Sequence, residues 1–183
     1  DPEDPDDAGS DADADGRSAA EEYEEGSDPS VYEGPGVPVL RSPVEEGEAS
    51  QPLVLSVWNA PAPLGQALTH SFALYALPSL EPDSLVASVE GLTDEADVTN
   101  WTVEEELEEN TWYHWVARAE DDHTVGPSME PASFFLNTAN DPPMAPAIRS
   151  PTDSAVVHEI ALSVVLPEDP DGDAVSIRFY LQP

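Results

Sequence analysis

Three aspartates near the end of the sequence, Asp169, Asp171 and Asp173, alternate around a Pro-Asp-Gly turn. Carboxylates with this spacing can direct several oxygen atoms toward one point, and calcium is the ion that prefers such hard oxygen ligands. Asp141, which lies earlier in the sequence, is a fourth candidate ligand. These four residues form the predicted metal site, with calcium as its ion.

A simpler interpretation of the same residues stays open. Pro, Asp and Gly are also the residues that a tight turn between two strands favours, with no ion involved. An EF-hand loop starting at Asp169 is excluded, because Tyr180 stands where that loop needs a bidentate glutamate.

Other residue types with chemical potential do not form a recognisable catalytic pattern. The acidic run of Glu104 to Glu109 is typical of a solvated corner rather than of paired catalytic carboxylates. The histidines lack zinc-site spacing, and His70 falls on the apolar register of an expected strand. The chain has no cysteine, which excludes disulfides and thiol catalysis. We therefore expect a protein that is not an enzyme. The four histidines are His70, His114, His123 and His158.

The charge balance excludes further classes of partner. The chain has 39 acidic and five basic residues among its 183, which gives a net charge of −34. A field of this sign repels phosphate backbones and anionic membrane surfaces, so neither nucleic acid nor a charged membrane is an expected partner. No apolar stretch approaches the length of a transmembrane helix, so we expect no membrane insertion in this segment.

Residues 1–35 differ from the rest in composition. They are rich in Asp and Glu with Gly, Ser, Ala and Pro between them, and they offer little apolar bulk to offset the entropy of ordering. The alternation of Asp11, Asp13 and Asp15 is also found in calcium-binding repeats, which is the functional alternative for this segment. We interpret these aspartates instead as part of a disordered, solvated acidic linker, because we expect no glycine-punctuated ligand loop with a closing glutamate after them.

The stretch from Leu107 to Ala119 has the strongest strand signal. Tyr113, Trp115, Ala117 and Ala119 alternate with outward-facing positions, which predicts one buried face. The polar residues before Tyr113 predict a corner, onto whose backbone the tyrosine hydroxyl can turn. The pattern L-x-x-N-T-x-Y-x-W-x-x-R-A resembles the E–F corner and F strand of a fibronectin type III domain, in the form found in bacterial surface proteins.

Further short alternating segments predict the rest of an all-β sandwich. The sequence shows frequent Pro and Gly turns and no helical periodicity between residues 36 and 139. The resemblance and this pattern together predict one fibronectin type III/Ig-like β-sandwich over 36–139. The expected strands are 37–43, 52–58, 68–75, 84–89, 101–103, 112–119 and 134–136.

Part of the pattern then recurs. Arg41-Ser42-Pro43 returns as Arg149-Ser150-Pro151, and Leu55-Ser56-Val57 returns as Leu162-Ser163-Val164. The offset of about 107 residues matches one sandwich module. We expect a linker over 140–146 and the first part of a second repeat, with three strands, over 147–183. Residues 147–183 are too few to bury both faces of a sandwich. We therefore expect the chain to be a fragment of a tandem array.

The resemblance implies a function in outline. It predicts a non-enzymatic secreted or cell-surface module, acting as spacer, stalk or adhesin, with other repeats of the same chain and a protein or polysaccharide ligand as partners. Calcium shared by the Asp169 loop, the linker at Asp141 and the Glu104–Glu109 corner would stiffen the joint between repeats. The alternative is an accessory carbohydrate- or protein-binding module of a larger secreted hydrolase. Both interpretations stay open at this point.

Overall fold

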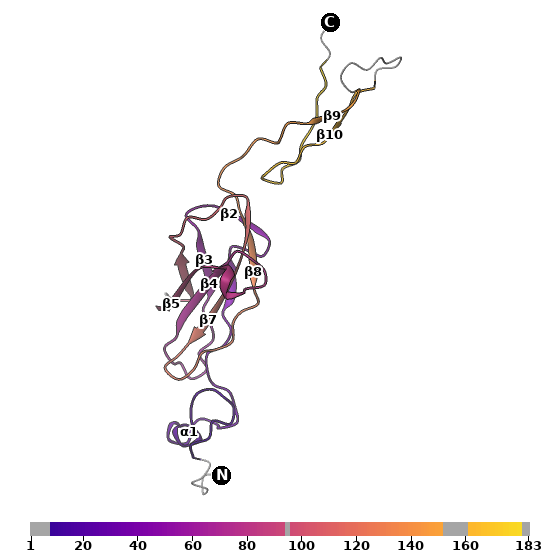
Figure 1. Ribbon diagram of the computed structural model, residues 1–183. Coiled ribbons are helices and arrows are strands. Elements are labelled where there is room, and N and C mark those ends of the chain that lie inside the picture. The colour runs from indigo at the N-terminus through magenta and orange to yellow at the C-terminus, as the bar shows by residue number, and fades with distance from the viewer. Residues whose placement is uncertain (1–7, 94–95, 152–160, 181–183) are drawn as a thin grey trace. The chain divides into compact units, whose positions relative to one another are not determined.

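The computed structural model describes residues 8–93, 96–151 and 161–180. The chain separates into two compact units, Asp1–Leu136 and Asn137–Pro183 (Figure 1). Among the described residues, no helix is long and apolar enough to cross a bilayer.

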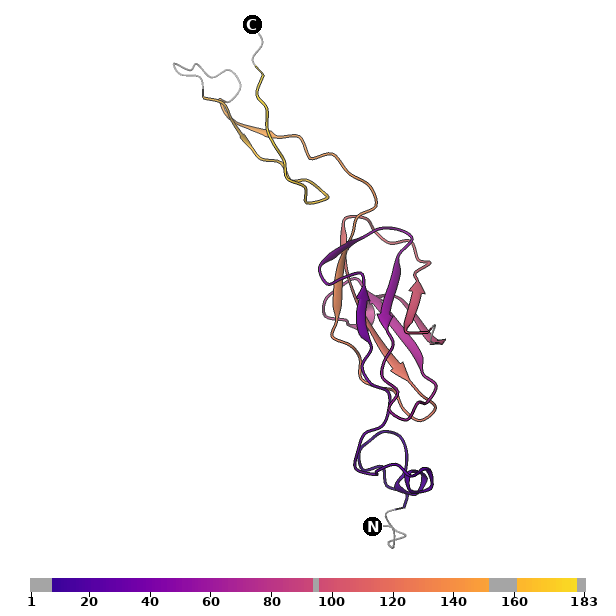
Figure 2. The same ribbon diagram turned by 180° about the vertical axis from the view of Figure 1, so that it is seen from behind.

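The first unit contains a sandwich of two β-sheets (Figures 1 and 2). The smaller sheet has the order β1 (Val39–Ser42), β3 (Val54–Trp58) and β6 (Val98–Thr102). The larger has the order β2 (Gly47–Ala49), β8 (Ala132–Leu136), β7 (Thr111–Glu120), β4 (Thr69–Tyr75) and β5 (Leu85–Thr93). A one-turn 3-10 helix, Pro82–Ser84, precedes β5. This all-β, fibronectin type III-like sandwich confirms the predicted fold class.

All seven strands expected for the sandwich are present, and β2 is an addition. β2 pairs in parallel with β8, whereas the other neighbouring strands of the two sheets are antiparallel. Only three residues long, β2 has no apolar alternation of its own, and its pairing with β8 depends on how the chain folds back. Sequence periodicity therefore could not reveal it.

The core lies between the two sheets and follows the alternation of the strands. Tyr113, Trp115, Ala117 and Ala119 are all buried on the inner face of β7, as predicted. Trp115 is fully buried, and its ring stacks on that of Phe72 with the ring centroids 6.0 Å apart. Burying each large apolar side chain stabilises the fold by about 1.5–3 kcal/mol.

The corner before β7 has the predicted tyrosine contact. Tyr113 is 4% exposed, and its Oη accepts a hydrogen bond from the Glu108 backbone N–H at 2.8 Å. The same hydroxyl donates to the Glu108 carbonyl at 3.4 Å. Burial raises the pKa of the Tyr113 hydroxyl above its ordinary value. The ring fills the core while the oxygen satisfies the corner backbone.

We expect Tyr113→Phe to lower the free energy of unfolding by about 1–3 kcal/mol, because it leaves the Glu108 N–H without its partner. Urea unfolding followed by tryptophan fluorescence measures the change. Tyr75→Phe, on the neighbouring strand β4 and only half-buried, is the matched control and should have little effect. Equal stability of Tyr113→Phe and the unsubstituted chain would contradict this role of the hydroxyl.

The described part of the acidic segment contains one short helix, α1 (Ala19–Glu25), at the N-terminal end of the first unit (Figure 1). Ser18 and Glu21 form a capping box at its start, and Gly26 ends it in the left-handed conformation. These caps satisfy backbone groups that a short helix otherwise leaves unpaired. The division of the chain at residue 35 stays a prediction.

The described part of the second unit contains a two-stranded sheet. β9 (Ala147–Ser150) pairs antiparallel with β10 (Ser163–Val165), and Ser150 and Ile148 lie opposite Ser163 and Val164. The third of the three strands expected over 147–183 is absent from the described residues 161–180, and residues 181–183 lie outside them. In the first unit β4, the strand on which this expectation is based, lies between β5 and β7. The described residues of the second unit form no such neighbouring strands.

Candidate metal centre

The Asp169 loop is a tight, hydrogen-bonded turn. Gly172 has a φ of +77°, which an L-residue adopts only with strain, and its N–H donates to the Asp169 carbonyl at 3.0 Å. The Asp169 carboxylate accepts from the N–H groups of Asp171 and Asp173, at 3.0 and 3.4 Å. The turn interpretation is therefore sufficient to explain Asp169 and Gly172.

The loop also brings its three carboxylates together. One oxygen from each of Asp169, Asp171 and Asp173 lies within 4.8 Å of the others. Asp171 is 8% exposed, and its Oδ1 is buried with no hydrogen-bond partner among the described residues. A divalent cation would satisfy such an oxygen.

Asp141 meets this group through its backbone. Its N–H donates to Asp171 Oδ2 at 2.6 Å, and the Asn140 amide donates to Asp171 and Asp173 at 3.3 Å each. The three grouped carboxylates do not include that of Asp141. The assignment of Asp169, Asp171, Asp173 and Asp141 as calcium ligands stays a prediction.

We expect Asp171→Ala to release the linker, because Asp171 Oδ2 accepts hydrogen bonds from both Asn140 and Asp141. The amide of Asp141 should lose protection from hydrogen exchange, as measured by NMR on the full chain. Asp173→Ala removes a charge from the same loop but leaves the Asp141 contact in place, so it is the control. Unchanged protection in Asp171→Ala would show that this hydrogen bond does not hold the linker.

The other residues with chemical potential lie outside this loop. His70 is fully buried, and its Nε2 accepts a hydrogen bond from the Ala60 N–H at 3.2 Å. The glutamates of the 104–109 corner are exposed, as expected of a solvated face. Trp112 is 45% exposed and packs on Phe135 with the ring centroids 5.5 Å apart. His158 lies outside the described residues.

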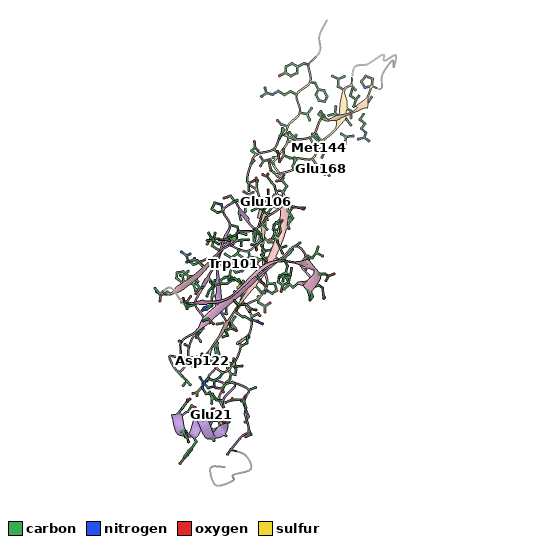
Figure 3. All side chains as sticks on the ribbon, turned by 60° about the vertical axis from the view of Figure 1, so that its left-hand side comes forward. Glu21, Trp101, Glu106, Asp122, Met144 and Glu168 are labelled. Atoms are coloured by element: carbon green, nitrogen blue, oxygen red, sulfur yellow. The ribbon has the colours of Figure 1, made fainter. Side chains whose placement is uncertain are left out.

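A second acidic cluster lies within residues 1–35, the segment predicted to be an acidic linker. Asp11, Asp13 and Asp15 each place a carboxylate oxygen within 4.8 Å of the others, and Asp15 does so again with Glu22 and Glu33. The cluster lies at the end of the first unit where Figure 3 labels Glu21 and Asp122. The sequence contains a pattern that indicates this cluster: counted from Asp11, Gly16 is at position 6 and Glu22 at position 12.

Comparisons with known proteins add a likeness of fold. No family model matches the chain, and no curated protein matches it. The crystal structure of the chicken CNTN1 FN1-FN3 domains is similar at 18% identity, with 62% of this chain and 38% of that chain covered and a TM-score of 0.38. The chain thus spans well under half of that structure.

The solution structure of the third fibronectin III domain of human KIAA0343 protein is also similar. It has 12% identity and a TM-score of 0.33, and the match covers 57% of this chain and 94% of that one. The fold assignment rests on the strand order and core of the chain itself.

Proposed function

We propose that this chain is a non-enzymatic extracellular module that serves as a spacer or adhesion segment in a series of β-sandwich repeats. A fibronectin type III-like sandwich is a structural or binding module, and here the second unit repeats its beginning. The observation that carries the proposal is the shared strand register. Ser42 lies opposite Ser56 in the first unit as Ser150 lies opposite Ser163 in the second.

Exposed apolar residues of the second unit support the same proposal. Ile148 is 74% exposed, and Phe179 and Tyr180 are 50% and 79% exposed. In a complete sandwich the corresponding strands bury such side chains between two sheets. A repeat completed by further chain would cover them, as the first unit covers Phe72 and Leu74.

Calcium at the joint is the finer part of this proposal. The linker residues Asn140 and Asp141 already contact the Asp171 carboxylate, and Asp171 Oδ1 has an open position for an ion. An ion bound there would join the linker to the second repeat and restrict bending between repeats. Without it, the neighbouring carboxylates repel one another.

An accessory carbohydrate-binding module of a larger secreted hydrolase is the second candidate. The exposed Trp112 packs on the half-buried Phe135 on the outer face of the larger sheet, and aromatic rings are suited to contact with apolar sugar faces. Binding of soluble polysaccharides, lost in Trp112→Ala, would favour this candidate over the spacer.

The spacer proposal is tested by small-angle scattering of a chain extended to complete the second repeat, in calcium and in chelator. We expect an elongated particle whose maximum dimension increases with calcium, because the ion restricts bending at the joint. Asp171→Asn should remove the calcium response, whereas Glu48→Gln on β2 should retain it. A compact particle would contradict the spacer, and identical profiles would contradict the calcium joint alone.

A further inference from the structure

The twelve residues from Asp11 to Glu22 have the spacing of a helix-flanked calcium loop. They read D-x-D-x-D-G-x-x-x-x-x-E, with aspartates at positions 1, 3 and 5, glycine at 6 and glutamate at 12. Such loops need glycine for a sharp turn at position 6 and a bidentate glutamate at position 12. Gly16 and Glu22 occupy these two positions.

The structure folds this segment as a loop around its carboxylates. Gly16 has a φ of +89°, and its N–H donates to Asp11 Oδ2 at 3.1 Å, which brings positions 1 and 6 together. The Asp15 N–H donates to Asp13 Oδ1 at 3.3 Å. A Cβ added at Gly16 would lie 2.7 Å from the His123 carbonyl oxygen, so a larger residue does not fit there.

Glu22 provides independent support for a ligand. It is fully buried on α1, and neither of its carboxylate oxygens has a hydrogen-bond partner among the described residues. Asp13 Oδ2 and Glu33 Oε2 are buried and unpartnered in the same way. Burial, followed by the charges of Asp13 and Asp15, raises the pKa of Glu22. Carboxylates are not normally buried without a compensating cation.

The cation that the chain itself supplies is directed elsewhere. Arg17 is 4% exposed and contacts Asp15 at 3.3 Å, but its other nitrogens lie near Asp121 and Glu25, each at 3.5 Å. Glu22 and Glu33 have no ion pair within the described part of the chain. Of the five carboxylates of Asp11, Asp13, Asp15, Glu22 and Glu33, only that of Asp15 has an ion pair among the described residues.

We propose that residues 11–22, together with Glu33, bind one calcium ion. Asp11, Asp13 and Asp15 would each give one carboxylate oxygen, Glu22 both of its oxygens, and Glu33 one from the segment after α1. The Arg17 carbonyl stands at position 7, where such loops contribute a backbone ligand. A set made only of oxygen donors fits calcium rather than the metals that favour nitrogen or sulfur.

The ion would fix the acidic segment to the sandwich. Gly16 lies against the loop after β7 at His123 and Thr124, and Arg17 reaches Asp121 in that loop. Gln66 donates to the Glu33 carbonyl at 2.9 Å. Without calcium, the repulsion among the carboxylates would release these contacts and leave the segment in the disordered state that its composition predicts.

Limited trypsin digestion of the full chain tests the proposal directly. The chain has no lysine, and Arg17 lies within the loop, so cleavage after Arg17 reports whether the loop is folded. We expect cleavage there in chelator and at least tenfold slower cleavage in millimolar calcium. Cleavage after the exposed Arg178 gives the protease activity in each buffer.

Matched variants make the result specific. Glu22→Gln should abolish the protection and raise the calcium dissociation constant, measured by calorimetry, by about 100-fold or more, since even residues that only orient metal ligands contribute 10- to 100-fold. Glu24→Gln makes the same charge change at an exposed position of α1, and Asp171→Asn alters the other loop; both should keep the protection. Equal cleavage with and without calcium would overturn the proposal. Protection that survives in Glu22→Gln, or that magnesium gives equally well, would also overturn it.

Discussion

The first unit depends on the burial of the inner face of β7. This strand lies between β4 and β8 in the larger sheet, and its inward side chains fill the space against the smaller sheet. Trp115, fully buried and stacked on Phe72, provides the largest of these contacts. Tyr113 connects the same face to the preceding corner. The two sheets could not pack if this face became polar.

The net charge of −34 opposes compact folding, because the carboxylates repel one another. The two acidic loops, residues 169–173 and residues 11–22, differ in how their carboxylates are stabilised. In the Asp169 loop, backbone N–H groups and the Asn140 amide supply hydrogen bonds to one oxygen of each of the three carboxylates. In the N-terminal loop, Glu22 is fully buried and neither of its oxygens receives one within the described structure. That difference makes the N-terminal loop the stronger candidate for an ion.

The sequence predicted the features that depend on local alternation and missed those that depend on folding back of the chain. The buried face of β7 and the Tyr113 contact follow from period-two patterns and known corner geometry. β2 has no such pattern, because its three residues are defined by their pairing with β8. The Asp11–Glu22 spacing was present in the sequence, but its low apolar content favoured disorder. The structure adds that Glu22 is buried and that its carboxylate lies beside those of Asp15 and Glu33.

The parallel pairing of β2 with β8 has a consequence for a chain under tension. The chain enters β2 at Gly47 and leaves β8 at Leu136. Because the two strands are parallel, these residues lie at opposite ends of the strand pair. A pull applied at Gly47 and at Leu136 would therefore load the β2–β8 hydrogen bonds in shear. The pairs Gly47–Phe134, Glu48–Phe135 and Ala49–Leu136 then bear the force together rather than opening one at a time. A three-residue strand that contributes little to the core would thus resist being drawn past β8 along the strand direction.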